Sequence, residues 1–237
     1  MPVAAAKTLT RPTVFDCSTE ELPSSMTTTA AKALVALCVA PLVVACTHTV
    51  TGTELRAPPG IDDDSRSPID VDPVLLDQSQ MRAITGGGDD LTVIPTMDGK
   101  QLVDIDTLAQ RVPPQCAWIF AETRTFGREV EEFHKTSYQN PPKGALISQG
   151  AAGYRDVATA RRAFDTLSTE VGKCGSSTSG YVGVWTATPD SIRTRTSTEC
   201  GRDYRLKSVV LVEVTFCAYP ASVPDIVMAN LLTNVPG

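Results

Sequence analysis

A run of apolar residues spaced three or four apart predicts one amphipathic helix in the second half of the chain. The residues are Val157, Ala160, Phe164, Leu167, Val171 and Cys174. This spacing places them on one face of an α-helix, because a helical turn takes about 3.6 residues. Asp156 is a suitable N-cap, and Gly172 and Gly175 lie near the far end. We therefore expect a helix over residues 157–174, with Cys174 on its buried side.

Residues 209–217 show a different pattern, typical of a strand in the middle of a sheet. Four large apolar side chains alternate along the segment: Val210, Val212, Val214 and Phe216. Alternating positions of this kind share one face of a strand, and β-branched residues favour strands. Glu213 and Thr215 interrupt the opposite face. We therefore expect a central strand with one apolar face and one mixed face.

Weaker patterns complete an α+β picture. Strands are indicated over residues 145–151, 181–187 and 192–196, and helices over residues 79–85, 104–111, 116–125 and 224–234. Strand and helix segments are interspersed, but several strand connections are too short for the crossovers that parallel strands require. The sequence therefore predicts a single α+β domain with a mainly antiparallel sheet.

The apolar stretch near the N-terminus has the pattern of an export signal instead. Counting from Met26, Lys32 supplies a positive charge, and residues 33–44 form an apolar stretch too short to span a bilayer. A small residue then precedes Cys46, which is the arrangement of a lipoprotein processing site. We predict that residues 1–45 are a leader and signal peptide, with Met26 as the true start. The mature protein would then be lipid-anchored through Cys46 on the extracytoplasmic face of the cell membrane.

Acidic residues are concentrated directly after this signal. The chain carries a net charge of -6, and seven acidic residues and two arginines within residues 46–78 account for -5 of it. Residues 46–73 are also rich in Pro, Ser and Asp and have no apolar periodicity, so we expect a flexible acidic tether there. The domain over residues 74–237 is then close to neutral. A domain without a basic stripe is a poor candidate for binding nucleic acid.

Four cysteines lie within the predicted domain: Cys116, Cys174, Cys200 and Cys217. An even number of cysteines in an exported chain indicates disulfides, and none of the spacings resembles the Cys-x-x-Cys motif of metal or redox sites. Four cysteines allow three connectivities. The Asp62-Asp63-Asp64 triplet lacks the turn glycine and closing glutamate of a calcium loop, so we expect no metal there.

Short motifs surround these cysteines in a characteristic order: Val112-Pro113-Pro114-Gln115-Cys116, then Gly153-Tyr154-Arg155-Asp156 leading into the predicted helix, then Phe216-Cys217-Ala218. Their order and spacing resemble the extracellular sensor domain of a mycobacterial transmembrane Ser/Thr protein kinase, a domain that also occurs alone in exported lipoproteins. The resemblance covers about residues 74–237. One departure is that the family usually has a tryptophan in the helix before the second cysteine, where this chain has Glu170-Val171-Gly172-Lys173.

The resemblance implies a curved antiparallel sheet with flanking helices around a cleft. It also implies sequentially paired disulfides, Cys116 with Cys174 and Cys200 with Cys217, and a ligand-sensing role. The chain shows no kinase motif and no transmembrane segment. Any signal would therefore have to pass to a separate partner protein.

Catalytic chemistry has little support in the sequence. Beyond the tether, where His48 lies, the only histidine is His134, and no Gly-x-Ser-x-Gly elbow occurs. Residues 86–90 and 99–101 lack the glycine or hydroxyl positions of dinucleotide and phosphate loops, so they are interpreted as turns and no cofactor is expected. A Ser or Asp within hydrogen-bond reach of His134 would favour catalysis instead.

Three side chains are candidates for a ligand cleft: Tyr154, Trp185 and Glu213. Each has a structural alternative, because the aromatics can be core residues and the carboxylate can be paired. We expect a non-enzymatic module that binds or senses a small-molecule or envelope ligand. The alternatives are an envelope hydrolase or transferase, and a structural or partner-docking lipoprotein. A deep cleft with convergent polar groups would favour binding, whereas a flat apolar patch would favour docking.

Overall fold

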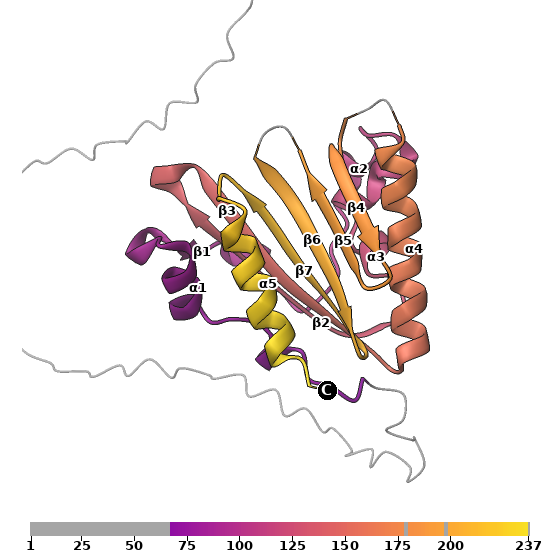
Figure 1. Cartoon of the computed structure of the whole chain (residues 1–237), viewed down its shortest axis with the longest axis horizontal. Coiled ribbons are helices and arrows are strands. Elements are labelled where there is room, and N and C mark those ends of the chain that lie inside the picture. Colours follow the sequence, from indigo (N-terminus) through magenta and orange to yellow (C-terminus); the bar gives the residue numbers. More distant parts are fainter. Residues whose placement is uncertain (1–66, 178–179, 197–198, 237) are drawn as a thin grey trace, which may run out of the picture. The chain divides into compact units, whose positions relative to one another are not determined.

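The centre of the structure is a seven-stranded antiparallel sheet with the strand order β1-β2-β3-β7-β6-β5-β4 (Figure 1). The computed structural model describes residues 67–177, 180–196 and 199–236. The strands are β1 (Thr92–Val93), β2 (Val130–Asn140), β3 (Ala145–Tyr154), β4 (Val184–Thr188), β5 (Ser191–Arg195), β6 (Cys200–Lys207) and β7 (Val210–Cys217). This arrangement confirms the predicted α+β class with an antiparallel sheet and flanking helices.

Helices cover both faces of the sheet. One face carries α1 (Gln78–Thr85) and α5 (Ser222–Asn234), and the other carries α4 (Val157–Gly175) together with η5 (Pro114–Phe120) (Figure 1). The remaining elements are α2 (Asp106–Ala109), α3 (Glu122–Thr125), η2 (Asp72–Val74), η3 (Gly88–Asp90), η4 (Pro95–Met97) and η6 (Pro141–Lys143). Among the described residues, no helix combines the length and apolar character needed to cross a membrane.

The alternation along β7 divides the interior into two cores. Val212 and Val214 pack in one cluster with Leu231 of α5. Leu211 points to the opposite face and packs in a second cluster with Phe164 of α4. We call these the α5 face and the α4 face of the sheet. Because side chains alternate along a strand, Glu213 lies on the α4 face.

The strongest sequence patterns are confirmed. Helix α4 begins after Asp156, whose Oδ1 accepts a hydrogen bond of 2.7 Å from the backbone N–H of Thr159, as expected of an N-cap. Strand β7 lies between β3 and β6, so it is central. The disulfides pair in chain order, Cys116–Cys174 and Cys200–Cys217, as the family resemblance implies.

Two long strands were not predicted. Strands β2 and β6 carry many charged residues, which weakens the alternation of apolar and polar side chains that indicates a strand. In the structure Lys135 and Asp203 pair with charged residues of other strands, and Lys207 donates to a backbone carbonyl of α5. The segment predicted as a helix over residues 116–125 is instead the 3-10 helix η5 followed by the single turn α3.

The folded region begins before the predicted boundary at residue 74. Val71 is buried in the α5-face core, and the partly buried Ile69 packs against the same cluster. Glu132 of β2 also accepts a hydrogen bond from the backbone N–H of Val71. Residues 67–73 therefore belong to the domain rather than to the tether. The rest of the predicted tether, Cys46 and the leader lie outside the described residues.

Candidate functional site

A buried ionic cluster on the α4 face is centred on Glu213. Its side chain is only 1% exposed and lies 3.3 Å from Lys135 Nζ of β2 and 3.7 Å from Arg202 Nη1 of β6. The Thr215 hydroxyl donates a hydrogen bond of 2.5 Å to the same carboxylate, and the Tyr204 hydroxyl donates one of 3.4 Å. The mixed face predicted for β7 is therefore occupied by a carboxylate that is paired inside the protein.

The sheet register brings these side chains together. Gly150 of β3 is the cross-strand partner of both Lys135 and Glu213. Because Gly150 has no side chain, Lys135 can extend over β3 to reach Glu213. A Cβ atom at Gly150 would already lie 3.6 Å from Lys135 and 3.7 Å from Glu213, so a longer side chain would enter the space that the ion pair uses.

Opposite charges balance in this cluster. Lys135 also pairs with Glu122 Oε1 at 3.0 Å, so two cations face two carboxylates. Burial alone would raise the pKa of Glu213, but the charges of Lys135 and Arg202 outweigh it and hold that pKa below its ordinary value. Burial opposes the charge of Lys135 as well, yet Glu213 and Glu122 outweigh it and raise the pKa of Lys135. The cluster is therefore stable in its fully charged form.

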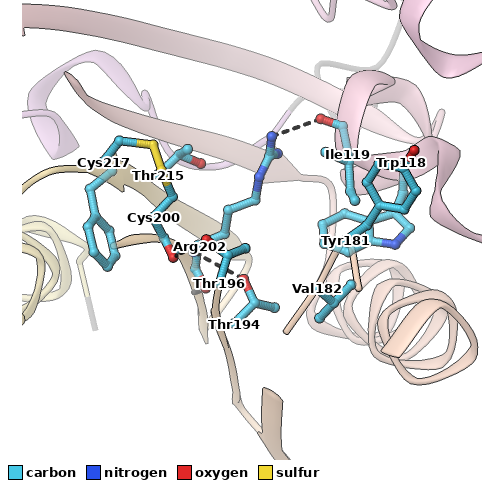
Figure 2. Close-up of a pocket in the computed structure, with 12 residues that line it drawn as sticks. Trp118, Ile119, Tyr181, Val182, Thr194, Thr196, Cys200, Arg202, Thr215 and Cys217 are labelled. Atoms are coloured by element: carbon cyan, nitrogen blue, oxygen red, sulfur yellow. Dashed lines mark hydrogen bonds between the residues drawn. A yellow bond between two sulfur atoms is a disulfide. The ribbon is translucent and has the colours of Figure 1, made fainter. Parts of the chain in front are cut away.

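A pocket of about 210 Å³ opens beside this cluster. Figure 2 shows the Arg202 side chain between the Cys200–Cys217 disulfide on one side and the rings of Trp118 and Tyr181 on the other. Val182 and Thr194 also line the pocket. A larger and more open depression of about 470 Å³ lies nearby and shares Cys200 and Phe216 with it.

Arg202 joins the pocket to the ionic cluster. Its Nη2 donates a hydrogen bond of 2.9 Å to the Ile119 carbonyl, and its guanidinium lies 5.9 Å from the centre of the Trp118 ring. Trp118 is 1% exposed, and its indole Nε1 has no hydrogen-bond partner among the described residues. The pocket therefore combines apolar walls with a guanidinium.

The three predicted cleft residues lie elsewhere. Tyr154 is a fully buried core residue, and its hydroxyl donates a hydrogen bond of 2.7 Å to the Phe126 carbonyl, so it does not line a cleft as expected. Trp185 is half-buried on β4 and packs against Gly172 and Gly175 of α4, which is possible because those positions have no side chain. Glu213 does not line the pocket, but it contacts Arg202 and Thr215, which do.

His134 lies on the α5 face and connects two N-terminal segments to β2. Its Nδ1 is 2.9 Å from Asp72 Oδ1, and its Nε2 is 3.2 Å from Asp98 Oδ1. Lys100 pairs with the second oxygen of Asp72, and the Thr136 hydroxyl donates to Asp98. Aspartates are thus within hydrogen-bond reach of His134, but both ring nitrogens are engaged by them. Within the described part of the chain, no group of three or more His, Cys, Asp or Glu side chains is arranged to hold a metal ion.

Sequence reasoning missed the residues that line the pocket, including Trp118, Tyr181 and Arg202. One signal could have found Arg202. If Cys200 and Cys217 are placed opposite each other on neighbouring antiparallel strands, the register brings Arg202 opposite Thr215 and Tyr204 opposite Glu213, as the structure shows. Trp118 and Tyr181 come from a 3-10 helix and a loop, where no periodic pattern marks the direction of a side chain.

Comparisons with known proteins identify the fold. The family model of the PknH-like extracellular domain matches residues 67–231. Among solved structures, the extracellular domain of PknH from Mycobacterium tuberculosis matches with a TM-score of 0.51 and 14% sequence identity. The match covers 68% of this chain and 91% of that one. A search of curated proteins gave no match. At this identity the structural match shows a shared fold.

Proposed function

The chain belongs to the family of PknH-like extracellular domains, and from that premise we propose that it is a non-enzymatic, ligand-binding module of the cell envelope. Its ligand site is the pocket between Trp118 and the Cys200–Cys217 disulfide. Its anchor is an acyl group on Cys46, with residues 46–66 as the acidic spacer between membrane and domain. A separate partner protein would carry any signal onward.

The grouping of Trp118, Tyr181 and Arg202 around one pocket is the observation that supports the site most strongly (Figure 2). Trp118 and Tyr181 offer aromatic rings on one side, and the Arg202 guanidinium lies between them and the Cys200–Cys217 disulfide. A bound molecule could therefore contact aromatic rings and a guanidinium in the same pocket.

The lining of the pocket indicates the class of ligand. Trp118, Tyr181 and Val182 offer an apolar, partly aromatic wall, and Arg202 offers a guanidinium that also contacts Glu213 at 3.7 Å. Small-molecule sites commonly combine an apolar lining with a few oriented polar groups. The ligand we propose is a small molecule with a flat apolar body and one carboxylate or other acceptor group.

Tryptophan fluorescence tests this site. The protein contains two tryptophans, so Trp185→Phe leaves Trp118 as the single reporter. We expect its emission to change saturably on titration with benzoate or phenylacetate, and more weakly with uncharged benzyl alcohol. Tyr181→Ala removes an exposed wall of the pocket and should weaken the response, whereas Val157→Ala, at an exposed position on α4, should not. No response to the acidic probes, or an equal response in Tyr181→Ala, would refute the pocket as the site.

The enzyme alternative is less well supported by the geometry. A catalytic triad needs one imidazole nitrogen on a carboxylate and the other on the nucleophile. At His134 both nitrogens face carboxylates, Asp72 and Asp98, which leaves no nitrogen to activate a hydroxyl. This arrangement suits a structural link between segments.

The anchor has its own test, which is independent of the pocket. Cys46 is the acyl acceptor at the predicted cleavage point, so Cys46→Ala should release the protein or stall its processing. Detergent phase partitioning of wild type and variant measures this. If both forms partition into the aqueous phase, the lipid anchor is wrong while the binding site stays unaffected.

A further inference from the structure

The two disulfides differ in their surroundings. Cys116 and Cys174 are 0% and 1% exposed and lie within the α4-face core. Cys200 and Cys217 are both only half-buried. Thiol–disulfide exchange depends on access to a sulfur atom, so the second bridge is the one that a dissolved thiol can reach in the folded protein.

The accessible bridge forms part of the pocket wall. Cys200 and Cys217 are cross-strand partners at the end of the β6–β7 ladder, and both line the pocket that contains Trp118 and Arg202 (Figure 2). Their side chains share the α4 face with Arg202 and Thr215, because alternate residues of a strand share one face. A small molecule that enters the pocket therefore meets the disulfide there.

We propose that the Cys200–Cys217 bridge is a thiol–disulfide exchange site for small thiols that enter this pocket. The thiolate of a monothiol attacks Cys200 Sγ, a bond forms between the two sulfurs, and Cys217 leaves as a thiolate. A second monothiol then attacks the mixed disulfide and releases Cys200 as a thiolate. In sum, two thiol molecules are oxidised to one disulfide, and the protein bridge is reduced to two cysteines.

Exchange at this position would change the pocket without unfolding the sheet. Beyond Cys200–Cys217, seven further residue pairs, from Gly201–Phe216 to Lys207–Val210, hold β6 against β7. Reduction would free only the last pair, at the end that borders the pocket. This part of the inference rests on the proposed function, because it makes ligand binding sensitive to thiols.

Differential alkylation of the folded, full-length mature protein tests the proposal. The protein is incubated with free cysteine or N-acetylcysteine without denaturant, quenched in acid, labelled with a maleimide and mapped by mass spectrometry. We expect modification of Cys200 and Cys217 to be at least about ten-fold faster than that of Cys116 and Cys174, which would react only after wider opening of the domain. Equal rates for the two bridges, or faster reaction of Cys116–Cys174, would overturn the proposal.

A matched pair of substitutions tests the route of entry. Ile119 lines the pocket and is half-buried, so Ile119→Trp should narrow the pocket and slow exchange at Cys200–Cys217 several-fold. Ile226 is 46% exposed on α5 and lies outside the pocket lining, so Ile226→Trp should leave the rate unchanged. An unaltered rate in Ile119→Trp would refute entry through the pocket. These rates are measured without any ligand, so the exchange site and the proposed binding function can fail separately.

Discussion

The two faces of the sheet differ in the contacts that stabilise them. On the α5 face, Val212, Val214 and Leu231 belong to an apolar core, and the buried Asp203 pairs with Arg195 beside it. The α4 face carries both disulfides, the Glu213 ionic cluster and the Trp118 pocket. Both faces therefore contain a buried ion pair, and the α4 face differs by its two disulfides and by the candidate site.

Polar groups on the α5 face have a structural role by contrast. Gln149 accepts a hydrogen bond of 2.9 Å from the Leu76 backbone N–H and donates one of 2.6 Å to the Leu76 carbonyl. These bonds attach the N-terminal segment to the sheet, and both ends of the buried amide are satisfied. Buried polar atoms without a partner among the described residues occur on both faces, for example Trp118 Nε1 on the α4 face and the Tyr219 hydroxyl on the α5 face. The polar contacts of Gln149 thus attach the N-terminal segment on the α5 face, and the proposed binding site lies on the α4 face.

The largest expected effect comes from breaking the ionic cluster. Glu213→Gln leaves Lys135 and Arg202 facing one carboxylate, Glu122, instead of two, which should lower the free energy of unfolding by about 3–5 kcal/mol. Urea denaturation measures this. The matched control is Glu129→Gln, which breaks an exposed pair with Arg162 and should cost about 1 kcal/mol or less. Equal losses in the two variants would contradict the importance of the buried cluster.

The same variant should alter the dependence of stability on pH. The pKa of Glu213 is lowered in the folded protein, so its contribution to stability is present above the ordinary pKa of a glutamate and is lost as the pH falls through the lowered value. Glu213→Gln should therefore flatten the acid side of the stability profile below about pH 4.5. Glu129→Gln serves again as the control, and a parallel acid profile in wild type and Glu213→Gln would show that the pairing is not coupled to stability.

Removing the disulfides should give the next largest decreases in the free energy of unfolding. The Cys116–Cys174 bridge closes 58 residues and the Cys200–Cys217 bridge closes 17 residues. Loop-closure entropy gives contributions of about 4 and 3 kcal/mol respectively. Double Cys→Ser variants, compared by denaturant unfolding, should therefore differ by about 1 kcal/mol. A greater loss from the shorter loop would mean that native-state contacts outweigh chain entropy.

A cavity in the α5 face should affect stability but not binding. Leu231 is fully buried against Val212 and Val214, so Leu231→Ala should cost about 3 kcal/mol, within the usual range for such truncations. The Trp118 fluorescence response to benzoate should keep its midpoint, because the pocket lies on the other face. A shifted midpoint in folded Leu231→Ala protein would show that the two faces are coupled.

The smallest effect is expected at His134. His134→Ala removes the contacts to Asp72 and Asp98, whose side chains are 42% and 43% exposed. The free energy of unfolding should therefore fall by about 1 kcal/mol or less. Complementation of a deletion strain should be largely intact. Loss of activity in a protein that still melts like wild type would favour the enzyme alternative.

The sequence was sufficient to predict the helix and the strand whose apolar residues recur at regular spacing. Helix α4 and strand β7 could be predicted because their buried faces are almost entirely apolar. Strands β2 and β6 could not, because Lys135 and Arg202 are charged residues that become acceptable inside the protein only through Glu213, which is distant in sequence. The candidate site was missed for the same physical reason: its residues meet through tertiary pairing and not through local pattern.

The central claim is that the pocket on the α4 face holds a small molecule, and native mass spectrometry of the mature protein purified from the envelope tests it most directly. We predict a bound mass beyond that of the acylated polypeptide, which is lost in Tyr181→Ala and retained in Val157→Ala. Protein that leaves the envelope without bound mass, or a mass that persists in Tyr181→Ala, would contradict the account.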